Sequence, residues 1–306
     1  MRIDARPTET AKTRWKTNRT IGFLLIGFSY LAALILGIIV FKAGTHSAWF
    51  NLLLADISAT VVIWGFSLLL DNASVYDPYW SVQPVVILPM VALWAGSYRL
   101  ISLILCGLVI IWGFRLTMNW AKTFHSLQDQ DWRYDLIKER TGKFYPLVNL
   151  LGIQLMPTLV VFACILPAVQ AIMNKLPFTG WTIPGMLVCL LGIGLETIAD
   201  HQMRNFRLRQ PNRKSIIQTG LWKHSRHPNY LGEILMWWGI YLICVASNPS
   251  GWFLALGAML NTALFLFISI PMAEKRLAAY KDEFAAYKKR TRMLLPIGKI
   301  KKLNPK

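Results

Sequence analysis

The chain has 306 residues, 55% of them hydrophobic, with 13 Trp and a mean hydropathy of +0.41. This composition excludes an ordinary soluble domain and predicts a protein that crosses a membrane several times. The formal net charge of +18 is compatible with nucleic-acid binding. However, no basic stripe interleaved with aromatic residues remains outside the apolar runs, so we predict no nucleic-acid partner.

Apolar runs of the length that crosses a bilayer, about 20 residues, recur from one end of the chain to the other. We predict an all-α, polytopic membrane bundle with about eight transmembrane helices. Seven is the alternative, because Pro84 and Pro89 interrupt one of the runs. The expected spans are residues 20–42, 48–70, 82–98, 100–119, 147–173, 181–203, 230–247 and 251–271.

Lys and Arg residues concentrate in four regions that flank these spans: residues 2–19, 120–146, 204–229 and those after 274. With eight spans these regions share one side of the membrane, and the positive-inside rule places that side, with both termini, in the cytoplasm. Anionic lipids beside this face account for much of the positive charge. The predicted organisation is a basic tail at 1–19, a helix bundle at 20–271, and an amphipathic helix with a basic tail at 272–306.

The first polar positions that need a reason are Asp56, Tyr76, Asp77 and Tyr79. Asp56 lies within the span 48–70 with no Lys or Arg nearby, so it needs a partner or a proton. The other three crowd a proline-containing turn, DNASVYDPYWSVQP. A Tyr held beside a carboxyl group can donate a proton or polarise a carbonyl, so we predict these four as catalytic residues. The alternative for the turn is an interfacial aromatic belt with a turn-forming Asp-Pro.

A second polar region, residues 115–140, contains WGFRLTMNW followed by DWRY. Arg fits the geometry of phosphate oxygens, and Trp and Tyr rings can stack on a purine, so the region suits an adenine nucleotide. In the alternative interpretation, Arg115 extends to the membrane surface and Asp131 with Arg133 forms a surface pair. The candidate cofactor residues here are Arg115, Asn119, Asp131, Trp132, Arg133 and Tyr134.

A third region places Glu196, Asp200, Arg204 and Arg207 at spacings of four, four and three. On a helix these side chains form one stripe about 16 Å long, which suits an extended charged ligand such as a dinucleotide. The alternative is a ladder of acid–base pairs within the stripe.

The segment TGLWKHSRHPNYLGEILMWWG, residues 219–239, sets a dense polar cluster against an apolar run. Asn229 and Glu233 share one helix face, at the expected cytosolic mouth of the bundle. The alternative is a helix entrance capped by Asn and Glu, with Arg and His on lipid headgroups. The candidate cofactor residues here are His224, Arg226, His227, Asn229, Tyr230 and Glu233. We predict no metal site, because no Cys or carboxylate joins the two His at ligand spacing and the four Cys lie in apolar runs.

Taken in order, YDPYWS, WGFRLTMNW with DWRY, ADHQMRNFR, and SRHPNYLGE with WWG make the chain after about residue 50 resemble bacterial membrane proteins of the steroid 5-alpha reductase C-terminal family. The resemblance implies an enzyme of the bacterial inner membrane that uses NADPH to reduce a carbon–carbon double bond conjugated to a ketone. Its lipophilic substrate would enter from the bilayer. Asp56 and Tyr76 or Tyr79 are the nearest counterparts of the acid and phenol that hold the ketone in steroid reductases. The positions that match nucleotide contacts are Asp200, Arg204, Arg207, Asn229 and Glu233.

Part of the chain is also similar to isoprenylcysteine carboxyl methyltransferases, through the RHPxYxGE pattern and the later segment EKRLAAYKDEFAAYKKRTRMLLP. That similarity implies S-adenosylmethionine as the cofactor. Several basic side chains around one pocket suit a phosphorylated dinucleotide better, since the methyl donor has no phosphate. We therefore expect an NADPH-dependent oxidoreductase with its cofactor site mainly at 115–140 and 196–240. The alternatives are a methyltransferase and a non-catalytic membrane protein that binds lipid or acts as a scaffold.

Overall fold

The computed structural model describes residues 14–210 and 214–296, and within them the chain is all-α. The prediction of a polytopic helical membrane protein is confirmed. The described residues contain no β-strand, apart from an isolated bridge between Ser225 and Arg292. The predicted tails at 1–19 and 272–306 lie partly outside the described residues.

Seven helical stretches of the described chain are long and apolar enough to cross a membrane. They are Arg19–Ala43, Ala48–Leu69, Leu100–Thr123, Trp132–Met173, Thr182–Arg209, Pro228–Ser247 and Pro249–Tyr280. The third expected span, 82–98, is not among these seven stretches. It corresponds to α3 (Tyr79–Trp94), which has 16 residues and contains Pro84 and Pro89. At 1.5 Å per residue α3 is about 24 Å long, shorter than the roughly 30 Å hydrocarbon core.

The chain forms two compact units, Met1–Gln83 with Leu116–Leu159 (unit 1) and Pro84–Arg115 with Val160–Lys306 (unit 2). Three helices run from one unit into the other: α3, α4 (Leu100–Thr123) and α7 (Met156–Met173). The remaining helices each belong to one unit.

Unit 1 is built on the hairpin of α1 (Arg19–Ala43) and α2 (Ala48–Leu69), which pack against each other. Asn18 begins α1 by accepting hydrogen bonds from the backbone N–H groups of Thr20 and Ile21. The short elements of the unit are η1 (Arg14–Thr17), η2 (Ala73–Tyr76), α5 (Trp132–Thr141), η3 (Gly142–Phe144), α6 (Tyr145–Val148) and the π-helix η4 (Asn149–Leu155). The core of the unit is apolar and aromatic and includes Ile63, Val75, Tyr76 and Tyr79.

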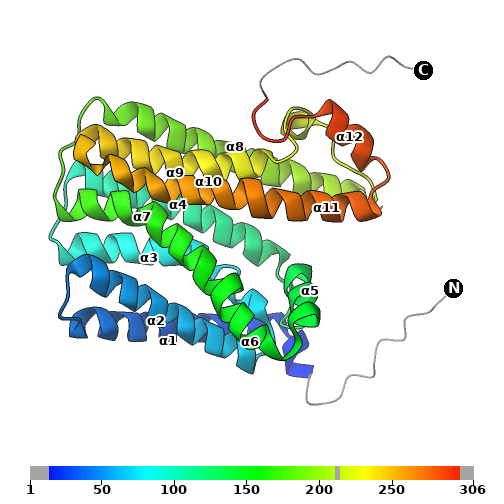
Figure 1. Ribbon diagram of the computed structural model, residues 1–306, viewed down its shortest axis with the longest axis horizontal. Helices are drawn as coiled ribbons and strands as arrows, with labels where there is room; N and C mark the ends of the chain where they lie inside the picture. Colours follow the sequence, from blue (N-terminus) through cyan, green and yellow to red (C-terminus); the bar gives the residue numbers. More distant parts are fainter. Residues whose placement is uncertain (1–13, 211–213, 297–306) are drawn as a thin grey trace. The chain divides into compact units, whose positions relative to one another are not determined.

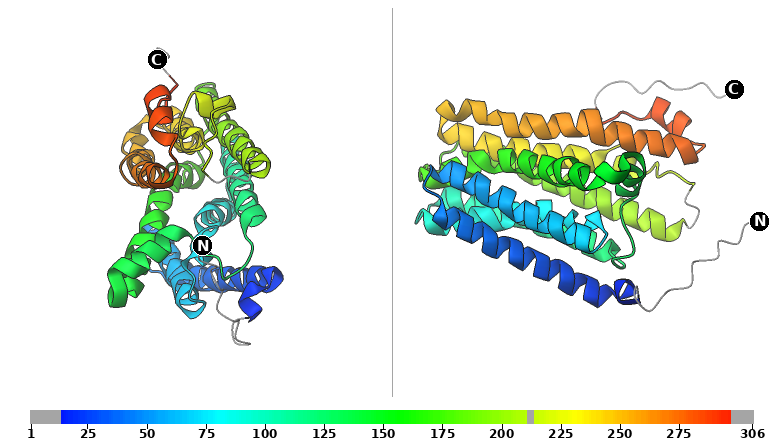
Figure 2. Two further views of the ribbon diagram at one scale, coloured as in Figure 1. Left: turned by 90° about the vertical axis from the view of Figure 1, so that its right-hand side faces the viewer. Right: turned by 60° about the horizontal axis from the view of Figure 1, so that its bottom comes forward.

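Unit 2 is organised around α8 (Thr182–Arg209) and α9 (Pro228–Ser247), which lie side by side (Figures 1 and 2). Their backbones approach closely through glycines. A Cβ added at Gly192 would lie 2.6 Å from the carbonyl oxygen of Gly232, and one at Gly239 would lie 2.5 Å from the backbone nitrogen of Cys189. Small residues at such a crossing let two membrane helices pack backbone to backbone.

The chain continues from α9 through η6 (Pro249–Leu254) and α10 (Ala255–Leu264) into a π-helical segment, η7 (Phe265–Ser269). α11 (Ile270–Tyr280) follows without a break, and α12 (Phe284–Arg290) comes after a short turn. η5 (Gly220–Lys223) lies between α8 and α9. In Figure 1 the orange ribbon shows α10 running on into α11.

Candidate functional site

In unit 2, three of the predicted cofactor residues form one ion-pair cluster. Arg115 on α4 lies between two acids of α8 that are one helical turn apart. Its Nη2 donates to Glu196 Oε2 at 2.5 Å and its Nη1 to Asp200 Oδ2 at 2.9 Å. The stripe predicted on α8 therefore exists, but its acids pair with a base from another helix. This arrangement differs from both interpretations of the stripe, an open ligand-binding face and a ladder closed by Arg204.

Glu233 on α9 is also buried, with 3% of its surface exposed. The indole N–H groups of Trp112 and Trp237 donate to its two carboxylate oxygens at 2.8 and 2.7 Å. The two indole rings meet edge to face, with centroids 4.9 Å apart. Glu233 also interacts with the carboxyl group of Glu196. Both its oxygens thus already have partners within the protein.

This cluster has an acidic excess and one unpaired donor. Glu196, Asp200 and Glu233 lie close enough to act on one another, and Arg115 is the cation that pairs with the first two in the described part of the chain. The Nε of Arg115 is buried without a hydrogen-bond partner. Sequence analysis missed Trp112, although it lies one turn before Arg115 on the same helix. That spacing was the available signal.

The last turns of α8 differ from the turns that carry Glu196 and Asp200, because the guanidinium groups of Arg204 and Arg207 form no ion pair within the described residues. Within residues 14–210 and 214–296, neither Arg204 nor Arg207 makes a hydrogen bond or an ion pair, and the side-chain amide of Asn229 on α9 has no hydrogen bond either. Burial, with the charge of Arg207, lowers the pKa of Lys281, whose ammonium group donates to the carbonyl oxygen of Ser215. Two cations therefore lie near each other at the end of α8.

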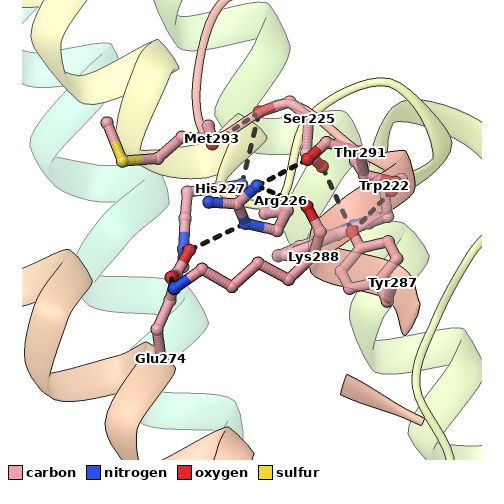
Figure 3. A network of polar contacts seen from close by, with 9 residues as sticks. All are labelled: Trp222, Ser225, Arg226, His227, Glu274, Tyr287, Lys288, Thr291 and Met293. Atoms are coloured by element: carbon pink, nitrogen blue, oxygen red, sulfur yellow. Dashed lines mark hydrogen bonds and ion pairs between the residues drawn. The ribbon is translucent and has the colours of Figure 1, made fainter. Parts of the chain in front are cut away.

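Arg226 and His227 hold the C-terminal part of unit 2 in place, as Figure 3 shows. The carboxylate of Glu274 on α11 accepts from Arg226 Nε at 2.7 Å, from Lys288 Nζ at 2.7 Å and from His227 Nε2 at 3.3 Å. Arg226 Nη1 donates to the carbonyl oxygen of Thr291 at 2.5 Å. We expected Arg226 and His227 to contact a cofactor, whereas the structure gives both of them partners within the protein.

Two further hydrogen bonds link the segment around Arg226 to the C-terminal part of unit 2. The N–H of Arg226 donates to the carbonyl oxygen of Arg292 at 2.8 Å. The hydroxyl of Tyr287 donates to the carbonyl oxygen of Trp222 at 2.6 Å (Figure 3). The residues that sequence analysis missed, Glu274, Tyr287 and Lys288, belong to the segment similar to the methyltransferases, and that similarity was the available signal. Of the other candidates, His224 is exposed and Tyr230 stacks on His227 with ring centroids 5.2 Å apart.

Unit 1 brings together the predicted catalytic residues. Asp56 on α2 and Gln83 on α3 are each 4% exposed, and Gln83 Nε2 lies 2.5 Å from Asp56 Oδ2. The hydroxyl of Tyr76 lies 2.9 Å from Oγ1 of Thr158, and that of Thr60 lies 3.3 Å from the same atom. Gln83, Thr60 and Thr158 were missed, because uncharged polar residues in apolar runs leave no distinctive pattern in a sequence.

Tyr79 and Asp77 extend this polar group in unit 1. The ring of Tyr79 lies 5.7 Å from that of Tyr76, and its phenol interacts with Thr60 and lies near Asp56. The hydroxyl of Tyr134 donates to Asp77 Oδ1 at 2.7 Å. Burial raises the pKa of Asp77 to about 6, although the hydrogen bond from Tyr134 opposes the shift.

The remaining candidates from 115–140 also lie in unit 1. Asp131 caps α5 by accepting from the backbone N–H of Arg133, and their side chains form an ion pair at 2.8 Å. This is the surface pair that we gave as the alternative. Asn119 and Trp132 are half-buried. Among the described residues, no group of three or more His, Cys, Asp or Glu could hold a metal ion.

A protein-family model matches residues 63–291, and its description is "Protein of unknown function (DUF1295)". The chain belongs to this family. The matched region of this DUF1295 protein includes the Arg115 cluster and the ion pairs of Glu274. It also includes most of the polar group in unit 1, although Asp56 and Thr60 precede it.

A curated protein of Schizosaccharomyces pombe, "Uncharacterized protein C594.04c", is 25% identical to this chain over 234 residues. The similarity covers 68% of this chain and 66% of the relative, so the chain spans just under two thirds of the relative's length. No solved structure matches the chain significantly.

Proposed function

We propose that this protein is an integral-membrane reductase that uses NADPH to saturate a carbon–carbon double bond conjugated to a ketone in a lipophilic substrate. The observation that carries the proposal is the contrast along α8. Its inner acids, Glu196 and Asp200, form ion pairs with Arg115, whereas the guanidinium groups of Arg204 and Arg207 form no ion pair within the described residues, and Arg207 acts on Asp200 only through its charge. Two open guanidinium groups one turn apart suit the phosphates of a dinucleotide.

In this proposal Arg204 and Arg207 bind the phosphates, and the amide of Asn229 binds the ribose or nicotinamide part. The Arg115 cluster stiffens α8 and α9 behind them. NADPH, when bound, supplies the hydride. Hydride addition to the β carbon of the enone would move an electron pair onto the ketone oxygen, and a proton taken from water by the α carbon would then give the saturated ketone.

Unit 1 supplies the substrate-binding polar group in this proposal. The buried phenols of Tyr76 and Tyr79 and the Asp56–Gln83 pair are hydrogen-bonding groups in an apolar surrounding, where such groups stabilise a developing oxyanion more strongly than they do in water. A lipophilic substrate dissolves among the membrane lipids and reaches these groups directly from the bilayer. We place the protein in a cytoplasmic membrane, with α3 as a short eighth crossing that brings the basic regions to the cytosolic side.

One observation favours a second candidate, a methyltransferase that uses S-adenosylmethionine. Three carboxylates, Glu196, Asp200 and Glu233, gather around Arg115, and two indoles lie beside Glu233. An acidic, aromatic surrounding attracts a sulfonium cation. In this case Arg204 and Arg207 would contribute little to cofactor binding. A non-catalytic lipid-binding or scaffold protein would bind neither cofactor.

Calorimetry on the full chain in mild detergent tests these proposals, with NADPH and S-adenosylmethionine as separate titrants. Arg204→Gln and Arg207→Gln each remove a charged hydrogen-bond donor worth about 1.5–3 kcal/mol, which corresponds to about a 10- to 100-fold loss of NADPH affinity. Arg209→Gln is the matched control, since Arg209 is also exposed on the last turn of α8 but lies off the stripe. Absence of NADPH binding to the wild type, or an equal loss in all three variants, contradicts the reductase.

A further inference from the structure

Gln83 is one of two side chains in the described part of unit 1, the other being Gln154, with a buried hydrogen-bonding atom that has no partner. It is 4% exposed, one end of its carboxamide lies 2.5 Å from Asp56 Oδ2, and its other end is buried without a hydrogen-bond partner. A buried carboxamide end left without a partner costs about 1–3 kcal/mol. The polar groups around it have their own contacts, since Tyr76 pairs with Thr158 and Tyr79 interacts with Thr60.

The charge of Asp56 decides which end of the carboxamide is the free one. Within residues 14–210 and 214–296, no Lys, Arg or His forms an ion pair with Asp56. A carboxylate buried among apolar helices with one amide donor and no cation is very unfavourable, whereas a neutral carboxyl group is tolerated. A neutral Asp56 donates its O–H to the carboxamide oxygen. Rotation about the last bond of Gln83 exchanges the two ends of the amide without moving its other atoms.

We propose that Gln83, held by a neutral Asp56, presents its amide N–H₂ as the donor that receives the carbonyl oxygen of a lipophilic ketone. The choice of a ketone as the ligand rests on the proposed reductase function. Gln83 then contacts the substrate, and Asp56 is a positioning residue that acts through it. No proton leaves the amide, and its hydrogen bond strengthens as negative charge develops on the ketone oxygen.

Infrared spectroscopy of the full chain without cofactor tests the state of Asp56. We expect a carboxylic-acid C=O band at neutral pH that is lost in Asp56→Asn. The same band should shift to higher frequency in Gln83→Met, which has a similar volume but no polar nitrogen or oxygen. Asp71→Asn, which changes an exposed acid of the same unit, is the control and should keep the band. The proposal fails if no band depends on Asp56, or if Gln83→Met leaves the band in place.

A second measurement tests the ligand, with a 4-en-3-one steroid carrying ¹³C in its carbonyl as the probe. Binding to the wild type and to Asp71→Asn should lower the carbonyl stretching frequency, and Gln83→Met should abolish that shift. Asp56→Asn should retain it, because an Asn amide can still donate to the Gln83 oxygen. A probe that does not bind, or that shows the same frequency in Gln83→Met, overturns the assignment of the ligand. NADPH calorimetry is independent of both spectra, so failure of the reductase proposal is distinguishable from failure of this one.

Discussion

Arg115 Nη1 on α4 lies 2.9 Å from Asp200 Oδ2 on α8. The two residues are 85 positions apart, and the pair joins helices that are not neighbours in the chain. The same guanidinium also binds Glu196, one turn earlier on α8. One side chain from α4 therefore neutralises acids of a helix that would otherwise carry buried negative charge.

Loss of the Arg115 guanidinium should destabilise unit 2. Arg115→Gln leaves Glu196 and Asp200 without their cation, and breaking a buried pair in this way typically costs about 3–5 kcal/mol. We expect a clear drop in the thermal unfolding temperature, which can be measured by Trp fluorescence in detergent. Arg99→Gln, which changes an exposed arginine outside this cluster, should unfold like the wild type. Equal behaviour of the two variants would contradict a structural role for Arg115.

The glycine contact between α8 and α9 should be sensitive to a single methyl group. In Gly192→Ala the added Cβ would lie 2.6 Å from backbone atoms of α9, so the helices must move apart, at a cost of about 1–3 kcal/mol. Gly194→Ala is the matched control, since nothing lies within 4 Å of its Cβ. Thermal unfolding of the two variants checks this prediction, and a comparable loss at Gly194 would show that close packing is not the cause.

Stability should depend on the ionisation of Asp77. Its pKa in the folded protein is raised to about 6, above the unfolded value of about 3.9, so between pH 4 and 6 the folded state binds more protons. The contribution of Asp77 to stability is therefore complete below about pH 4 and is lost as pH rises through about 6.

We expect Asp77→Asn to unfold at a higher temperature than the wild type at pH 7.5 and at a similar temperature at pH 3.5, below the unfolded pKa. The shift of about two pKa units sets an upper limit of about 3 kcal/mol on the difference. Asp71→Asn, which changes an exposed acid of the same unit, should not alter the pH profile. A profile unchanged in Asp77→Asn would remove this explanation.

The connection from Arg226 to the C-terminal part of unit 2 should control local opening. Arg226→Lys keeps a positive charge but cannot bind Glu274 and Thr291 at the same time, and Tyr287→Phe removes the hydrogen bond to Trp222. Loss of about 1–3 kcal/mol should speed hydrogen exchange in residues 284–296 by about 10- to 100-fold. Lys289→Gln, at an exposed position of α12, is the control. Unchanged exchange in both variants would show that other contacts hold the segment.

Local spacing predicted part of the candidate site. Glu196 and Asp200 share a helix face as their spacing of four requires, and Tyr76 and Tyr79 lie close to Asp56 in unit 1. The partners of these residues were not predictable. Gln83, Trp112 and Glu274 come from other helices or distant segments, and an interhelical pair depends on how two helices are rotated and offset against each other.

Hydropathy was enough to determine that this is an all-α membrane protein, because a chain in a bilayer must satisfy its backbone hydrogen bonds within helices. Periodicity of 3.6 residues also determined which side chains share a face. Only the tertiary structure decided which charged side chains on those faces form ion pairs and which do not. Arg115 pairs with the inner acids of α8, whereas Arg204 and Arg207 form no ion pair in the described residues. That difference arises from the approach of α4 to α8 within unit 2, which no local pattern in the sequence encodes.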